Sequence, residues 1–389
     1  MRIAITNPTN WPYLRRGLER FINELAEYLS RRGHEVDIVC GAPGKTEVVK
    51  QRGYTTWYYR RLWHPALQKA GFLEFHAFFF PALFHLLRHR YDVVFTGTFM
   101  DAYAAKLARR VTGTPYVLTG FAIPPRVRYF RSLTLKGAIY KRAVLGADAF
   151  LTISNYVRDY FIARWDKESP VLRIPVDTRL FRPVRRDLDA PPTILCAAAL
   201  DDPRKGGRVL MRAFDRLKNK RPDLRLQLAW SLPPRLEAEF ADLVSPCWHK
   251  DVHFLGTGVD LPEAFARASI TVLPSLWEAQ GMVLIESLAA GTPVVCTRDG
   301  ALPEIVTDPR VGCLFDPGDG DVCEPTNVDG LVHAIEQCLE LSRRPETSDN
   351  CRTFAQRFSW DQLGPAWESM LEKYARKAAN APAAVECRG

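Results

Sequence analysis

The sequence predicts an α/β protein built from two Rossmann-like, doubly wound parallel-sheet domains. Three observations support this prediction. The 389 residues exceed the length over which a single hydrophobic core keeps growing. Short apolar runs alternate with amphipathic helical patterns, as in βαβ units with buried parallel strands. This alternation restarts after a polar, proline-rich stretch at 181–192, which has the composition of a linker.

In the first half, an apolar run at 3–5 is followed by an amphipathic helical pattern at 18–32. Gly33 ends that helix, because glycine is favoured just past a helix end. Five further strands are expected in this half, at 36–40, 93–95, 116–118, 149–153 and 171–174.

In the second half, an apolar run at 193–196 precedes an amphipathic helix at 207–217. Four further strands are expected, at 224–228, 252–255, 270–273 and 293–296. Two such domains face a cleft at the carboxyl ends of their strands, which is the usual ligand site of open α/β sheets. The first strand is followed by Asn7-Pro8-Thr9-Asn10 rather than G-x-G-x-x-G, so an ordinary NAD-binding domain is not expected.

The positive charge belongs to one half of the chain. Residues 1–180 hold 28 Lys and Arg against 14 Asp and Glu, a net charge of +14, and the remainder holds 25 against 30. A basic surface indicates an anionic partner, such as nucleic acid, an anionic membrane or a phosphorylated acceptor. An arginine-rich genome is the alternative, but it would not explain the uneven distribution.

Composition also indicates where the chain works. Nine scattered cysteines without a C-x-x-C pair argue against a disulfide framework or a zinc site and favour a reducing cytosol. We expect no secretory leader and no membrane span, because no apolar run reaches about 18 residues. The eight histidines form no convincing metal-ligand set.

The most informative segment is 273–295. A buried strand ends at Pro274-Ser275, a loop carries Glu278 and Gly281, and an apolar helix is expected from near Met282 to Gly291. Free N–H groups at a helix start bind anions, and glycine lets a ligand approach the backbone. Glu286, one turn into this helix, could face the ligand and accept hydrogen bonds from a sugar diol.

This segment resembles the E-x7-E motif of family 4 glycosyltransferases, which have the GT-B fold and are retaining and metal-independent. Its two glutamates are Glu278 and Glu286, within a matching P-S-x-x-E-x-x-G pattern. The resemblance extends over nearly the whole chain, through the stretches 16–20, 32–36, 147–154, 174–183, 201–206, 254–256 and 358–360. It implies an acceptor-binding domain at 1–183, completed by a C-terminal helix at about 366–389, and a donor-binding domain at 184–365.

The resemblance also implies roles for single residues. Glu286 would hold the ribose, Glu278 the donor sugar, and Lys205 the charge of the departing diphosphate; Glu278 is not assigned as a nucleophile. The donor would be a nucleotide-diphosphate sugar, most simply UDP- or GDP-linked, with no cofactor or metal. Further donor contacts are expected from Gly17, Arg204, Gly256, Gln280, Gly281, Met282 and Val283.

Several single residues depart from the family pattern. Arg16 replaces the first glycine of the opening motif, as an extra cation near the phosphates or as a solvated loop residue. The usual arginine before the K-G loop is Ala199, and Arg204 is a possible replacement. The usual histidine after the strand at 116–119 is Phe121, so Gly120 and Phe121 would keep a backbone contact and lose a side-chain contact.

Aromatic residues alternate with arginines at 57–64 and 126–131. This pattern favours peripheral contact with an anionic membrane and a lipid-linked or envelope acceptor over a soluble acceptor, and disfavours nucleic acid. A buried helix contact is the structural alternative. We therefore expect a cytoplasmic protein, peripheral at the membrane. Two other functions stay open: a sugar-nucleotide epimerase of similar architecture, and a catalytically weak sugar- or lipid-binding protein.

Overall fold

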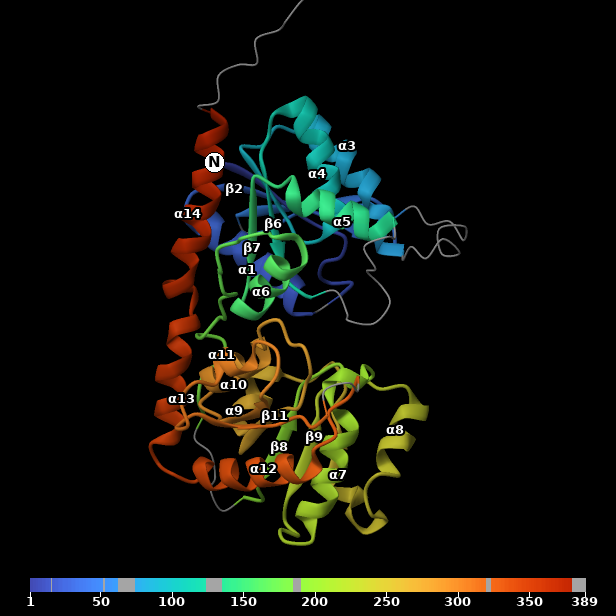
Figure 1. The fold of residues 1–389 in the computed structure, drawn as a ribbon, viewed down its shortest axis with the longest axis vertical. Coiled ribbons are helices and arrows are strands. Elements are labelled where there is room, and N and C mark those ends of the chain that lie inside the picture. Colours follow the sequence, from blue (N-terminus) through green and yellow to red (C-terminus); the bar gives the residue numbers. More distant parts are fainter. Residues whose placement is uncertain are drawn as a thin grey trace, which may run out of the picture. The chain divides into compact units, whose positions relative to one another are not determined.

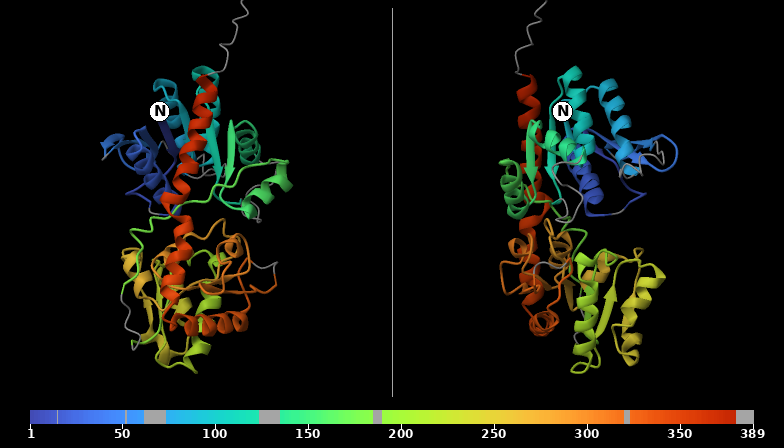
Figure 2. Two further views of the ribbon diagram at one scale, coloured as in Figure 1. Left: turned by 90° about the vertical axis from the view of Figure 1, so that its left-hand side faces the viewer. Right: turned by 45° about the vertical axis from the view of Figure 1, so that its right-hand side comes forward.

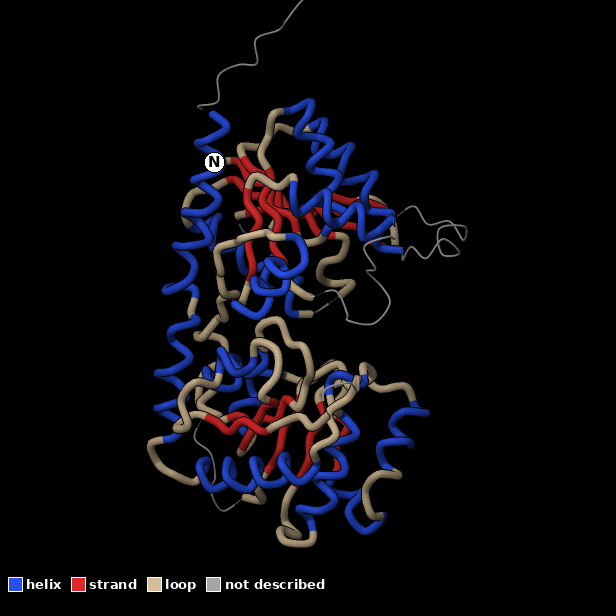
Figure 3. Tube along the Cα trace, viewed as in Figure 1, coloured by secondary structure: helices blue, strands red, loops and turns tan. Residues whose placement is uncertain are grey.

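The computed structural model describes residues 1–14, 16–51, 53–61, 74–123, 135–184, 190–319 and 323–379. The chain forms two compact units, Met1–Arg173 with Leu363–Gly389 (unit 1) and Ile174–Gln362 (unit 2). Figure 3 shows that the strands of each unit gather into a sheet with helices around it. This confirms the predicted pair of parallel-sheet α/β domains.

Unit 1 has a seven-stranded sheet in the order β3-β4-β2-β1-β5-β6-β7. Neighbouring strands are parallel, except that β3 pairs antiparallel with β4 at one edge. The strands are β1 (Arg2–Asn7), β2 (Glu35–Ala42), β3 (Glu47–Lys50), β4 (Tyr54–Arg60), β5 (Val93–Thr96), β6 (Tyr116–Gly120) and β7 (Ala149–Thr152).

Helices cover both faces of this sheet (Figure 1). Three lie side by side, with α3 packed on α4 and α4 on α5, and the views of Figure 2 agree. The helix α1 begins at Gly17 and contacts β1, β2 and β4. The bounds are α1 (Gly17–Arg31), α3 (Phe79–Arg88), α4 (Phe99–Thr112), α5 (Leu135–Leu145) and α6 (Asn155–Trp165), with a short 3-10 helix η1 (Glu74–Phe78).

Unit 2 has a six-stranded parallel sheet in the order β10-β9-β8-β11-β12-β13. The strands are β8 (Thr193–Cys196), β9 (Arg225–Leu228), β10 (Val252–Phe254), β11 (Ile270–Leu273), β12 (Val294–Thr297) and β13 (Gly312–Phe315). The helices are α7 (Gly207–Lys218), α8 (Pro234–Ala241), α9 (Leu261–Arg267), α10 (Met282–Ala289), α11 (Leu302–Ile305), α12 (Val328–Ser342) and α13 (Thr347–Ala355), with the 3-10 turns η2 (Pro203–Lys205), η3 (Pro246–Asp251) and η4 (Gln356–Phe358).

The boundary between the units lies before the expected position at 183, because the stretch after Arg173 is bonded to unit 2. Val176 forms a parallel bridge with Ser359. The guanidinium of Arg352 donates to the carbonyl oxygens of Thr178 and Phe181. The proline-rich stretch at 181–192 was expected to be the linker, but the chain passes from unit 1 to unit 2 between Arg173 and Ile174.

Most predicted strands are confirmed, with three differences. The expected strand at 171–174 is wrong, because Val171 forms only an isolated bridge with Thr152. Prediction missed the β3–β4 pair, because residues 57–60 of β4 were interpreted as part of a surface, and it missed the short edge strand β13, which contains glycine.

The final helix α14 (Trp360–Ala379) belongs to unit 1 from Leu363 onward, as the family resemblance implied. Trp367 is buried, its ring centroid 4.9 Å from that of Phe21 on α1, and its Nε1 donates to the carbonyl of Arg173 at 3.0 Å. Gly364 allows close packing, because a Cβ there would lie 2.6 Å from the ring of Tyr28.

No helix within the described residues is long and apolar enough to cross a bilayer. The cysteines in the described part of the chain are free thiols.

Candidate active site

The predicted donor segment folds as a strand, a loop and a helix. β11 ends at Leu273, and α10 begins at Met282 with Gly281 as its N-cap. Gly281 has φ +78°, a backbone conformation that favours glycine. A Cβ at this position would lie 2.5 Å from Cδ2 of Leu302. The first N–H groups of α10, including those of Met282 and Val283, have no partner further back in the helix and can bind an anion.

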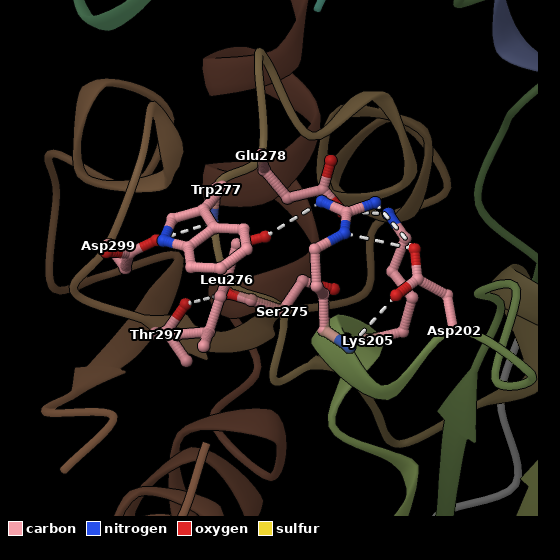
Figure 4. Close-up of polar contacts among 9 residues, drawn as sticks. Asp202, Lys205, Ser275, Leu276, Trp277, Glu278, Thr297 and Asp299 are labelled. Atoms are coloured by element: carbon pink, nitrogen blue, oxygen red, sulfur yellow. Dashed lines mark hydrogen bonds and ion pairs between the residues drawn. The ribbon is translucent and has the colours of Figure 1, made fainter. Parts of the chain in front are cut away.

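The loop before α10 is held against residues 297–301 (Figure 4). Trp277, also at positive φ, donates its backbone N–H to Oδ2 of Asp299 at 2.5 Å. Ala301 donates its N–H to the carbonyl of Glu278 at 2.9 Å. A Cβ on Gly300 would lie 2.7 Å from that carbonyl oxygen, so the close approach requires glycine. The backbone around Glu278 is therefore fixed before any ligand arrives.

A second loop brings the predicted cation to the same place. Lys205 ends the turn η2, and its Nζ forms an ion pair with Oε1 of Glu278 (Figure 4). Both side chains are largely shielded, with 18% and 16% of their surfaces exposed. Gly206, at φ +69°, permits this contact, because a Cβ there would lie 2.3 Å from the carbonyl oxygen of Pro274.

Arg204 connects the two loops. Its N–H groups reach Oδ2 of Asp202 at 2.7 Å and the carbonyl of Leu276 at 3.3 Å, and its own carbonyl accepts from the N–H of Leu276 at 2.8 Å. Arg204 was expected to stand in for the family arginine that is absent at Ala199. In the structure its guanidinium already has a carboxylate partner, Asp202.

Two further donor-side residues have distinct surroundings. Glu286 lies in α10 with 1% of its surface exposed, so its carboxylate is buried within the protein. Gly256 follows β10 at φ +70°, where Thr257 donates its N–H to Oγ of Ser231 at 3.0 Å. That hydrogen bond joins the loops that follow β9 and β10.

The side chain of Gln280 forms hydrogen bonds with the backbone of Ile174. Its Oε1 accepts from the N–H of Ile174 at 2.7 Å, and its Nε2 donates to the carbonyl of Ile174 at 2.8 Å. Both atoms of the buried amide are thus used within unit 2. The side chain of Gln280 therefore fixes the backbone at Ile174, and the donor contact expected of this residue stays a prediction.

The predicted acceptor-side residues lie in unit 1. Gly120 ends β6, where a Cβ would lie 3.0 Å from the ring of Phe161, so packing explains the glycine. The ring of Phe121 packs against Phe21 and Phe95 at centroid distances of 5.6 and 6.2 Å. An aromatic side chain in place of the usual histidine therefore joins the packing around α1. Arg16 is exposed and precedes Gly17 in extended conformation as the N-cap of α1.

Sequence reasoning missed a buried polar group at the carboxyl end of β1. The hydroxyl of Thr9 donates to Oε1 of buried Glu19 at 2.6 Å. Asp101 is fully buried and accepts from the hydroxyl of Thr6 at 2.7 Å and the N–H of Gly97 at 3.0 Å. Burial raises the pKa of Asp101 to about 7 despite these donors. Glu19 lay inside the quoted opening motif, which was the available signal.

One group among the described residues has the proximity of metal ligands, namely His34, Glu368 and Glu372. Arg32 already contacts Glu368 at 3.1 Å, and Nε2 of His34 lies 2.9 Å from the same carboxylate. The guanidinium supplies the positive charge that a metal would bring, so we interpret this group as an ion-pair network that fixes α14.

The described part of the segment at 57–64 makes contacts within unit 1. Trp57 donates its Nε1 to Asp37 at 3.1 Å, and the hydroxyl of Tyr58 reaches the carbonyl of Trp11 at 2.5 Å. Tyr58 is buried and Trp57 partly buried, so packing in unit 1 accounts for these two aromatics. The remainder of that segment and the stretch 126–131 lie outside the described residues.

Family models match both halves of the chain. The model described as Glycosyltransferase Family 4 matches residues 15–179, and the one described as Glycosyl transferases group 1 matches residues 191–340. An MMP alpha-(1->4)-mannosyltransferase of Mycolicibacterium hassiacum is 31% identical over 57% of this chain and 51% of its own length. A D-inositol 3-phosphate glycosyltransferase of Arthrobacter is 30% identical over 58% and 59%. The matched region thus spans only about half to three fifths of these relatives.

Solved structures share the fold. Sucrose-phosphate synthase of Thermosynechococcus elongatus superposes with a TM-score of 0.79 at 18% identity, covering 97% of this chain and 99% of that one. Anabaena HepE, solved with UDP and glucose, gives a TM-score of 0.72 at 18% identity, covering 96% and 100%. The chain therefore belongs to the family 4 glycosyltransferases and has their GT-B fold.

Proposed function

We propose that this protein transfers a sugar from a nucleotide-diphosphate sugar to a hydroxyl acceptor, with retention of anomeric configuration. The observation that carries the proposal is the ion pair between Lys205 and Glu278, which lie 73 residues apart in the sequence. Lys205 is paired with a residue of the loop that leads into α10, so the lysine and the N-terminus of this helix would both contribute positive potential to a ligand bound at this loop. This is the environment that a departing diphosphate requires.

The residues near this ion pair would have different roles in donor binding and catalysis. Lys205 and the first N–H groups of α10 would bind the diphosphate and stabilise the charge that grows as the glycosidic bond breaks. A fixed donor of this kind contributes about 3–4 kcal/mol to transition-state stabilisation. Donor binding would also free Glu278 from its ion pair, so that its carboxylate can accept hydrogen bonds from the sugar. Glu286 is assigned to the ribose, and both glutamates bind rather than attack.

We propose a UDP- or GDP-linked donor and no catalytic metal. The UDP in the HepE structure supports the first choice. Lys205 and the helix start supply positive charge at the leaving group, which is a role that divalent metals take in other enzymes.

The acceptor is proposed to carry a phosphate and to be lipid-linked, with the enzyme working at the cytoplasmic face of a membrane. The net charge of +14 in residues 1–180 supports an anionic acceptor. The relative named for inositol 3-phosphate fits the same chemistry.

A donor screen by mass spectrometry tests these proposals. Purified protein is incubated with UDP-, GDP-, ADP- and dTDP-sugars, with and without lipid extract, beside Lys205→Ala and Glu286→Ala. We expect acceptor-dependent release of one nucleoside diphosphate, insensitive to a chelator and lost in both variants. A surface variant, Lys220→Ala, should behave as wild type, because Lys220 is largely exposed and its ion pair is with Glu336 on the surface of unit 2.

Three results would contradict parts of the proposal. Failure of any donor to shift the thermal unfolding midpoint refutes the donor site. An epimerised sugar nucleotide without acceptor refutes transfer in favour of epimerisation. Inversion in the NMR spectrum of the product refutes retention.

A further inference from the structure

The outer face of α3 exposes large apolar side chains. Phe80, Phe84 and Leu87 have 55%, 54% and 38% of their surfaces exposed. Their spacing of four and then three residues places them on one side of the helix. A soluble domain rarely leaves two phenylalanines this open next to each other without a partner for that surface.

The opposite face of α3 is fixed to the sheet, so this exposure is not a sign of a loose helix. His85 is buried, with Nδ1 2.8 Å from the hydroxyl of Tyr59 and Nε2 2.7 Å from that of Tyr91. Burial lowers the pKa of His85 to about 3, so this histidine stays neutral. Ala82 and Leu86 pack on the same inner side.

The neighbouring helices add cations and more exposed apolar surface. Val111 at the end of α4 is 76% exposed, and Leu145 at the end of α5 is 47% exposed. The only carboxylate in the sequences of α3, α4 and α5 is that of Asp101, which is buried. The described basic side chains on these helices are Arg88, Lys106, Arg109, Arg110, Lys141 and Arg142.

Most of this positive charge is not neutralised within the described residues. Arg109 pairs with Asp148 at 2.6 Å. Lys106 instead donates to the backbone carbonyl of Arg142 at 2.8 Å. Burial and the nearby charges of Arg110 and Arg142 lower the pKa of Lys106. Three cations that repel one another in this way create a positive potential that an anionic group would relieve.

We propose that the outer surface of α3, α4 and α5, here called the α3–α5 face, docks on an anionic lipid bilayer. Exposed phenylalanines can enter the region between headgroups and acyl chains, and the basic side chains then contact lipid phosphates. The absence of any exposed carboxylate from these helices favours a lipid surface over a protein partner, whose interface would combine charges of both signs. This inference deepens the proposed function, since a lipid-linked acceptor would be met at such a surface. It also moves the membrane contact away from the residues that the sequence suggested.

Sedimentation with sucrose-loaded vesicles tests the proposal without donor or acceptor. The full chain is mixed with vesicles of phosphatidylcholine alone or of phosphatidylcholine and phosphatidylglycerol in equal parts. We expect binding to the anionic vesicles only, and release when salt shortens the screening length. Arg88→Gln with Arg110→Gln should weaken binding about thirtyfold, and Phe80→Ser with Phe84→Ser about tenfold or more.

Matched controls come from unit 2. Arg343→Gln with Arg344→Gln removes two exposed arginines, and Leu180→Ser with Val184→Ser removes two exposed apolar side chains. Both control pairs should bind as wild type. Equal binding to neutral vesicles, no binding by wild type, or equal losses in test and control variants would overturn the proposal. The vesicle assay needs no sugar transfer. If the protein binds anionic vesicles but turns over no donor, the membrane inference holds and the proposed transferase activity fails.

Discussion

Lys205→Met removes the cation that we assign to the leaving group and also breaks the ion pair with Glu278. Removing one partner of a buried pair costs about 3–5 kcal/mol. Here the two side chains are 18% and 16% exposed, so water can reach the remaining carboxylate in part. We therefore expect the free energy of unfolding to fall by about 1–3 kcal/mol. The matched variant Lys220→Met breaks an exposed pair and should cost less than about 1 kcal/mol.

The double variant Lys205→Met with Glu278→Gln separates stability from catalysis. It leaves no unpaired charge in the buried position, so urea unfolding should return to within about 1 kcal/mol of wild type. Transfer should stay roughly 10²–10³-fold slower, because the diphosphate still lacks its cation. The assays are urea denaturation and initial rates on the donor that the screen identifies. If the double variant regains both stability and rate, Lys205 serves only the fold, and its catalytic assignment is refuted.

Three further predictions concern the donor loop and the buried acid of unit 1. Gly281→Ala should lower the free energy of unfolding by about 2–3 kcal/mol and weaken nucleotide binding, because φ is +78° and the new Cβ is crowded. The control Gly258→Ala, whose Cβ would have no atom within 4 Å, should change the free energy of unfolding in urea by less than about 0.5 kcal/mol. An equal loss in both variants would contradict the argument. Gln280→Leu leaves a buried N–H and C=O unpaired and should cost about 2–4 kcal/mol, and a neutral result in thermal and urea unfolding would show that water takes its place. For Asp101, the folded-state pKa of about 7 exceeds its unfolded value of about 4, so the folded chain retains a proton that the unfolded chain loses as the pH rises between these values. Stability should therefore fall across this window relative to Asp101→Asn by about 4 kcal/mol. Parallel pH profiles of the two proteins would refute the buried ionisation.

The local order of elements was predictable because it depends on neighbours in the chain. Apolar runs such as 270–273 matched β11, and the expected helix start near Met282 was confirmed. Gly281, between the two glutamates of the motif, predicted a ligand loop at the helix start, since glycine lets a ligand approach the backbone there.

Contacts between distant segments could only come from the tertiary structure. Nothing in the sequence shows that the amide of Gln280 pairs with the backbone of Ile174, because an amide serves a sugar hydroxyl or a peptide group equally well. The aromatic residues at 57–59 have the same composition in a packed strand as on a membrane surface, and only burial distinguished them. The sequence likewise does not show which residues of the apolar stretch in α3 are buried, and only the structure shows that its phenylalanines Phe80 and Phe84 are exposed. Sequence periodicity therefore determined which segments form strands and helices, whereas the packing of segments far apart in the chain decided which polar groups have partners and which apolar groups remain in water.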